Sequence, residues 1–225
     1  MGLFCFYMLK KGFIFDLDGV IVDTAKYHYF AWKKLAESLG ITFSEEDNEH
    51  LKGVSRVRSL EKILEWGNAS LPNDTFQELL TEKNNDYLSF VNAMTQNEIL
   101  PDVPRVLSFL QDHHQPMALG SASKNAKSIL QKVALMDRFQ VIVDGNEVTQ
   151  AKPNPEVFLR AAEGLRMAPQ HCVVFEDSLA GIQAANSAGM TSIGIGDAAI
   201  LGEADFVFHD FTELSNEFLD QLIHT

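Results

Sequence analysis

The stretch GFIFDLDGVIVDT, residues 12–24, decides how the rest of the chain is interpreted. It opens as an uninterrupted apolar run, which predicts a buried strand, and that strand ends in two carboxylates, Asp16 and Asp18. Alternate side chains of a strand point the same way, so both carboxylates can face one site while Leu17 turns back into the core. Gly19 allows a sharp exit from the strand. Such a strand end suits a hard cation and a phosphate, although Asp and Gly are also common in ordinary turns.

Size and charge narrow the classes of function. The chain has 225 residues, of which 46% are hydrophobic, enough for one large domain or two small ones. It carries 18 Lys and Arg against 31 Asp and Glu, a net charge of −13. This balance argues against nucleic acid and anionic membranes as partners. An anionic substrate would need local cations, and a divalent metal would offset part of the carboxylate field.

The cysteines and the N-terminus predict a cytoplasmic protein. Cys5 and Cys172 form no disulfide framework, which indicates a reducing compartment. The run MGLFCFYML, residues 1–9, is short and lacks the basic start and cleavage site of a signal peptide. Met8 lies just before the first expected strand, so we expect translation to start there naturally, with residues 1–7 dispensable. Loss of folding on deleting those residues would contradict this expectation.

Strands and helices alternate over most of the chain, which predicts an α/β fold with a parallel sheet covered on both faces. Ser123 is expected to cap one helix, Pro155 to occupy the first position of another, and Gly189 to end a third. The expected strands are 12–16, 116–120, 140–143, 172–175, 191–195 and 205–208, and the expected helices 102–112, 123–134, 155–165, 178–187 and 212–223.

One segment breaks the alternation. Between the first strand and the rest of the sheet, apolar residues recur only at helical spacing, with expected helices at 26–39, 44–50, 56–66 and 73–93. We therefore expect an inserted helical cap domain at 25–94, and an α/β core made of 1–24 and 95–225.

Three more polar motifs follow expected strands, where parallel sheets bind their ligands. The motif GSASKN, residues 120–125, can offer a hydroxyl and backbone N–H groups to an anion. The alternative is that Ser123 only caps the following helix. The motif AKPNP, residues 151–155, holds Lys152 in a proline-stiffened loop, although most lysines are simply solvated. The motif VFEDS, residues 174–178, brings a second pair of carboxylates, with helix capping by Asp177 or Ser178 as the alternative.

The order of these motifs resembles that of the haloacid dehalogenase superfamily of aspartyl-phosphate enzymes, and the resemblance spans the whole chain. Within it, the cap is similar to that of the β-phosphoglucomutase family in Thr24, His28 and Trp32, in LKGVSR at 51–56 with Ser59, and in KNNDY at 83–87. The motifs SASKN at 121–125 and EDSLAGIQA at 176–184 are similar too; Gly120 departs from the alanine or other small residue expected there.

The resemblance implies a Rossmann-like core and an enzyme that interconverts β-glucose 1-phosphate and glucose 6-phosphate. Asp16 would be the nucleophile and Asp18 the general acid/base. One Mg²⁺ per chain would be held by Asp16, the Asp18 carbonyl and Asp177, with Glu176 in the same shell. Phosphate would be bound by Ser121, Ala122, Lys152 and, at the distal end, Arg56.

The same resemblance implies a phosphorylated hexose as substrate, glucose 1,6-bisphosphate as activator and intermediate, and a monomer. Thr24 and His28 would link cap closure to the placing of Asp18. The other residues that would line the sugar or close the cap are Trp32, Lys52, Gly53, Val54, Ser55, Ser59, Lys83, Ser123, Lys124 and Asn125. The rival hypotheses are a Mg²⁺-dependent sugar-phosphate phosphatase on the same scaffold and a binding protein without catalysis; a dehalogenase would need neither Asp18 nor Asp177.

Overall fold

The computed structural model describes residues 10–224, so Cys5, Met8 and the expected alternative start lie outside the described residues. Six parallel strands form one sheet in the order β3-β2-β1-β4-β5-β6. This arrangement confirms the predicted parallel sheet. The strands are β1 (Gly12–Phe15), β2 (Met117–Gly120), β3 (Val141–Val143), β4 (Cys172–Glu176), β5 (Thr191–Ile195) and β6 (Phe206–Phe208).

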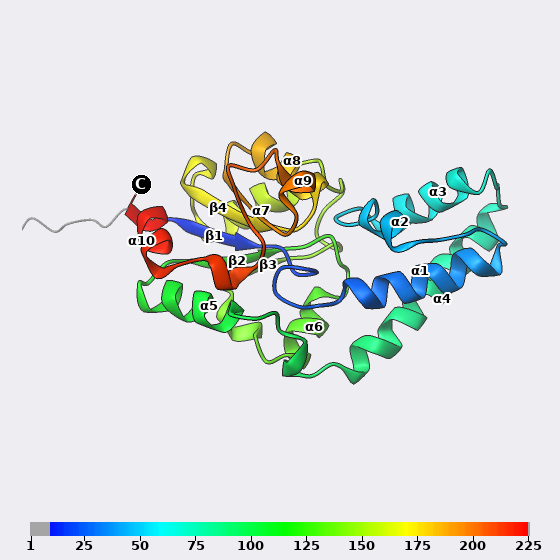
Figure 1. The fold of residues 1–225 in the computed structure, drawn as a ribbon, viewed down its shortest axis with the longest axis horizontal. Helices are drawn as coiled ribbons and strands as arrows, with labels where there is room; N and C mark the ends of the chain where they lie inside the picture. The colour runs from blue at the N-terminus through cyan, green and yellow to red at the C-terminus, as the bar shows by residue number, and fades with distance from the viewer. Residues whose placement is uncertain (1–9, 225) are drawn as a thin grey trace, which may run out of the picture.

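Helices cover both faces of the sheet, because the strands are apolar on both sides (Figure 1). Phe13 and Phe15 of β1 face one core, with α5 (Val103–Asp112), α6 (Ala126–Lys132) and α10 (Asn216–His224). Ile14, between them, faces the second core, with α7 (Glu156–Leu165) and α8 (Leu179–Ser187). The remaining short elements of this part are α9 (Ala198–Leu201) and the 3₁₀ turns η1 (Gln96–Glu98), η2 (Met136–Arg138), η3 (Pro169–His171) and η4 (Phe211–Glu213).

The segment after β1 is helical and extends away from the sheet (Figure 1). It comprises α1 (Ala25–Ser38), α2 (Glu45–Glu49), α3 (Arg56–Trp66) and α4 (Asn73–Ala93). Its buried residues, including Trp32, Leu60 and Ile63, form a hydrophobic cluster of their own. Across residues 10–224, no helix is both long and apolar enough to cross a bilayer.

The two passages between the sheet and the helical segment are tied together. The backbone N–H of Asp23 donates to the carbonyl of Glu98 (2.9 Å), and that of Leu100 donates to the carbonyl of Ile21 (3.0 Å). Lys26 binds the carboxylates of both Asp23 and Glu98 at 2.9 Å. The chain therefore leaves and re-enters the sheet region through one hydrogen-bonded strip.

Several helix boundaries differ from those predicted. The helix expected from Ser123 begins at Ala126, and the Ser123 hydroxyl instead accepts a hydrogen bond from the backbone of Asn125 (3.3 Å). Pro155 precedes α7 rather than opening it. The last helix begins at Asn216, after the separate turn η4. Gly189, with φ +71°, follows the end of α8 as expected.

Candidate active site

A cavity of about 460 Å³ lies between the carboxyl ends of the strands and the helical segment. Every site residue predicted from the sequence lines it except Thr24 and Glu176. These two are fully buried, and each hydrogen-bonds to a residue that does line the cavity. The structure thus brings motifs spread from residue 16 to residue 177 around one space.

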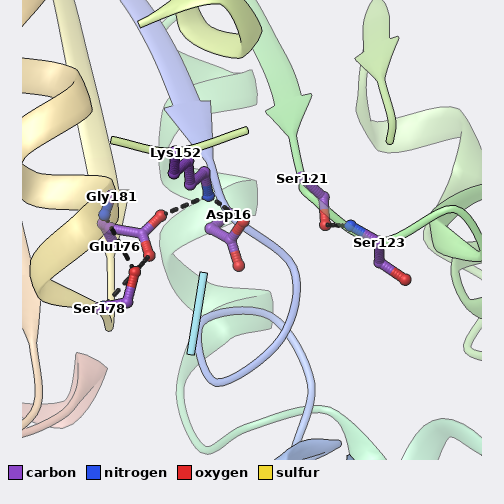
Figure 2. Close-up of polar contacts among 7 residues, drawn as sticks. All are labelled: Asp16, Ser121, Ser123, Lys152, Glu176, Ser178 and Gly181. Atoms are coloured by element: carbon purple, nitrogen blue, oxygen red, sulfur yellow. Dashed lines mark hydrogen bonds and ion pairs between the residues drawn. The ribbon is translucent and has the colours of Figure 1, made fainter. Parts of the chain in front are cut away.

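Lys152 is held between two carboxylates on the sheet side of the cavity (Figure 2). Its ammonium lies 2.5 Å from Oδ1 of Asp16 and 2.8 Å from Oε2 of Glu176, with the Phe158 ring centre 4.8 Å away. Its side chain is 1% exposed, which rules out the solvated-lysine interpretation of this loop. Paired in this way, the ammonium is fixed at the end of β1.

Burial controls the ionisation of this group of residues. It raises the pKa of Asp16 well above its ordinary value, and the neighbouring Lys152 ammonium opposes the rise. For Lys152, burial would lower the pKa, but the charges of Asp16 and Glu176 outweigh it and raise the pKa. Lys152 therefore stays charged at neutral pH.

Glu176 is fixed from two sides. Its Oε1 accepts hydrogen bonds from the backbone N–H (3.1 Å) and the hydroxyl (2.5 Å) of Ser178, while Oε2 binds Lys152. The Ser178 hydroxyl in turn accepts from the backbone N–H of Gly181 (3.1 Å), capping α8. A Cβ atom at Gly181 would lie 2.0 Å from Cδ of Glu176, so only glycine leaves room for this carboxylate.

Three carboxylates at this edge can supply oxygen ligands to a cation. Ligand oxygens of Asp16, Glu176 and Asp177 lie within 4.8 Å of one another. Gly19 (φ +80°) permits this grouping, because a Cβ there would lie 2.1 Å from Oδ2 of Asp177. Burial raises the pKa of Asp177 to about 7, against the attraction of Lys52. An all-oxygen, carboxylate-rich set fits a hard divalent cation.

Ser121 directly follows β2, at the same edge of the sheet as Asp16 (Figure 2). Its side chain is buried, and its hydroxyl oxygen accepts a hydrogen bond from the backbone N–H of Ser123 (3.1 Å). Both serines line the cavity, together with Ala122. The loop therefore presents hydroxyl and backbone groups to the same space as Asp16.

Asp18 faces the helical segment rather than Lys152. Its Oδ1 accepts from the hydroxyl of Thr24 and from that of Tyr87 (3.4 Å), and it lies 3.8 Å from Nε2 of His28. Burial alone would raise its pKa, but the hydrogen bonds from His28 and Thr24 and the charge of Lys83 lower the pKa overall. Asp18 and Asp16 are therefore held by different partners.

Lys83 is buried among His28 and two aromatic rings. Its ammonium is 2.8 Å from Nδ1 of His28 and lies over the rings of Trp32 (4.5 Å) and Tyr87 (5.0 Å). Burial lowers the pKa of Lys83 to about 7, and the nearby charge of Arg56 contributes to the same shift. No carboxylate forms a salt bridge with it among residues 10–224.

Arg56 opens α3 and lines the cavity. Burial lowers the pKa of its guanidinium, and within the described part of the chain it forms no ion pair. Its neighbour Arg58, in contrast, is paired with Glu61 and Glu65 on the surface. An unpaired guanidinium in a cavity is suited to an anionic ligand.

Besides Asp18, the helical segment also contacts Asp177, Ser178 and Asn125 of the sheet side. Lys52 binds Oδ2 of Asp177 (3.2 Å), and a Cβ atom at Gly53 would lie 2.4 Å from the Ser178 hydroxyl. The side chain of Asn125 donates to that of Asn84 (3.2 Å). These contacts close the cavity on either side.

Sequence reasoning assigned no role to Tyr87, Asn84, Ser178 or Phe158. The first two lie inside the quoted motif KNNDY, and Ser178 was considered only as a helix cap. Phe158 is an apolar residue within a helix, so the sequence gives no sign of a role at the site. Only the contact of its ring with the Lys152 ammonium shows that it belongs there.

Comparison with known proteins assigns the family. The sequence pattern of the haloacid dehalogenase-like hydrolases matches residues 10–189. The chain belongs to this family. It is 42% identical to the β-phosphoglucomutase of Bacillus subtilis over 94% of each chain. The crystal structure of β-phosphoglucomutase from Clostridium difficile superposes with a TM-score of 0.90 at 42% identity, covering 95% of this chain and 97% of the other. A fructose-1-phosphate phosphatase of Escherichia coli is 33% identical over 84% of this chain and 98% of its own.

Proposed function

We propose that this member of the family is a β-phosphoglucomutase that interconverts β-glucose 1-phosphate and glucose 6-phosphate. One observation carries the proposal: the cavity offers positive groups at two separate places. Lys152 lies beside Asp16 on the sheet side, and Arg56 lines the cavity from the helical side without an ion pair. A sugar bisphosphate carries two phosphates, one for Lys152 and one for Arg56. The 42% identity to a known β-phosphoglucomutase supports the same function.

Asp16 is proposed to attack phosphorus through a carboxylate oxygen, forming an acyl phosphate while the sugar oxygen leaves. Lys152 and Ser121, with the backbone at Ala122, would stabilise the transferring phosphoryl oxygens. Asp18 would give a proton to the departing sugar oxygen and later take one from the attacking hydroxyl. The separate partners of the two carboxylates support this division of roles.

A divalent cation, proposed as Mg²⁺, fits the carboxylates of Asp16, Glu176 and Asp177, with the Asp18 carbonyl as a further oxygen. When bound, such a cation supplies positive charge to the transferring phosphoryl group and lowers the pKa values of the carboxylates. The protein's own contribution is to keep those oxygens fixed through Lys152 and Gly19.

The helical segment 25–94 is proposed as a cap domain over the core formed by 1–24 and 95–225. Phospho-Asp16 must meet a sugar hydroxyl rather than water, and a cap that closes on a bound sugar phosphate excludes water. The other predicted site residues would position the sugar and close the cap. They are Thr24, which binds Asp18, and the cavity-lining His28, Trp32, Lys52, Gly53, Val54, Ser55, Ser59, Lys83, Ser123, Lys124 and Asn125.

The decisive experiment measures two products at once. The protein is incubated with β-glucose 1-phosphate, Mg²⁺ and a trace of β-glucose 1,6-bisphosphate, and glucose 6-phosphate and free phosphate are assayed together. Glucose 6-phosphate without stoichiometric phosphate is the expected result. Phosphate release alone would favour a phosphatase, the activity of the E. coli relative.

Glucose 1,6-bisphosphate is proposed as activator and intermediate. This predicts a lag in the formation of glucose 6-phosphate when the bisphosphate is left out of the assay.

We also propose a cytoplasmic monomer without nucleic-acid or membrane partners, consistent with a net charge of −13. Light scattering on the purified chain would test the monomer directly.

A further inference from the structure

Ser178 occupies the point where three parts of the molecule meet. Its hydroxyl donates to Glu176, accepts from Gly181, and lies where a Cβ atom on Gly53 of the helical segment would approach to 2.4 Å. The residue is 2% exposed. A helix cap needs only the second of these contacts, so capping alone does not account for the arrangement.

The contacts form a chain that ends at the nucleophile (Figure 2). Ser178 supplies both hydrogen bonds to Oε1 of Glu176. With that oxygen held, Oε2 is directed at Lys152, which binds Oδ1 of Asp16. Within the described residues, Glu176 has no other side-chain hydrogen-bond partners, so its orientation depends on Ser178.

We propose that Ser178 is a positioning residue for phosphoryl transfer, acting through Glu176 on the ammonium of Lys152. The inference rests on the proposed function for its chemistry, since Lys152 is taken to stabilise the transferring group. Without the hydroxyl, Oε1 of Glu176 keeps only the hydrogen bond from the Ser178 backbone N–H, so the carboxylate is held less firmly against Lys152. The ammonium then spends less time in the geometry that the transition state requires.

The test compares Ser178→Ala with Ser44→Ala. Each change removes a serine that caps a helix, but Ser44 caps α2 far from Glu176. Both variants should lower the melting temperature, and Ser178→Ala should lower it more, because its buried hydroxyl also binds Glu176. Only Ser178→Ala should lower kcat, by about 10- to 100-fold with KM nearly unchanged. Hydrolysis of 4-nitrophenyl phosphate is the assay, because it needs Asp16 and Lys152 but no sugar acceptor.

A double variant tests the route. If Ser178 acts through Glu176, Ser178→Ala combined with Glu176→Gln should lose no more activity than Glu176→Gln alone. Gly181→Ala is a second way to displace Glu176, since its Cβ would lie 2.0 Å from Cδ of that residue. Alanine favours helix more than glycine does, so a loss there cannot come from weakened helix propensity. Losses that multiply in the double variant would overturn the proposal.

A readout without turnover separates this inference from the proposed function. Reductive methylation followed by mass spectrometry should find Lys152 protected in the wild type and labelled several-fold faster in Ser178→Ala. The exposed Lys34 serves as internal reference. Unchanged protection of Lys152, or wild-type kcat in Ser178→Ala, would overturn the positioning role. Absence of turnover in the wild type would contradict the proposed function alone.

Discussion

The two sides of the cavity differ in how their positive charges are satisfied. On the sheet side, Lys152 is bound to Asp16 and Glu176 and is almost completely buried. On the helical side, Arg56 forms no ion pair within residues 10–224, and Lys83 has only an imidazole and two aromatic rings. The sheet side is thus organised before any ligand binds, whereas the helical side leaves cations for an anion to neutralise. We therefore propose that chemistry and substrate capture are divided between them.

The largest effect should come from the sheet side. Asp16→Asn removes the oxygen that is proposed to form the acyl phosphate, so kcat should fall by about 10⁴-fold or more. The measurement is steady-state turnover of both the sugar phosphate and an aryl phosphate. Asp144→Asn is the matched control, because Asp144 is also buried but lies outside the cavity lining. Substantial turnover by Asp16→Asn would contradict the assignment of the chemical step to the sheet side.

Arg56 tests the helical side. Arg56→Ala should lower kcat/KM for the mutase reaction by about 100-fold, because remote phosphate binding would no longer be used to close the site. Hydrolysis of an aryl phosphate, which lacks the second phosphate, should change little. Arg58→Ala serves as control, since its guanidinium is already paired on the surface. Equal losses in both assays would contradict the role of Arg56.

Gly53 tests the contact between the two sides. Gly53 (φ +70°) and Gly40 (φ +72°) adopt the same left-handed backbone, and alanine at either costs about 1 kcal/mol of stability. Only at Gly53 would the added Cβ meet the sheet side, because nothing lies within 4 Å of a Cβ at Gly40. Gly53→Ala should therefore raise KM for the sugar phosphate, and Gly40→Ala should not. Identical kinetics for the two variants would show that this contact is unimportant.

The effect of Lys83 should be on stability against pH rather than on turnover. Its pKa of about 7 in the folded protein lies below that of an unfolded lysine, so the unfolded chain binds more protons between about pH 7 and 10.4. Across this window the wild type should gain up to about 1.4 kcal/mol of stability per pH unit from this group. Lys83→Met should be the more stable form at pH 7.

Urea unfolding of wild type and Lys83→Met at several pH values measures this difference. The advantage of Lys83→Met should shrink steadily as the pH approaches 10. A constant difference across the series would mean that Lys83 titrates in the folded protein as an exposed lysine does.

The sequence predicted those features that rest on local pattern. The run of apolar residues before Asp16 predicted β1, and the motif order predicted which strand ends share a cavity. Gly19 was expected to turn the chain, but its φ of +80° also makes room for Asp177, a contact between distant segments. A need for space between two segments that are distant in the sequence produces no periodic pattern in the sequence itself.

The errors and omissions have the same origin. Serine is a residue type typical of helix caps, so Ser123 was expected to cap a helix. Its hydroxyl instead accepts a hydrogen bond from the backbone of Asn125, and the helix starts later, at Ala126. The role of Ser178 was hidden because capping explains a serine before a helix equally well. Local rules identify what a residue can do, whereas packing between segments decides which of those options the protein uses.

The position of β1 in the chain has a consequence for folding. Phe13 pairs with Met117 on one side and with Val173 on the other. The strand that carries Asp16 therefore emerges from the ribosome before both of its neighbours and cannot be enclosed until β4 has been made. Pairings this distant in sequence slow folding and leave an apolar strand open to wrong partners. The segment that carries the proposed nucleophile thus needs protection during synthesis.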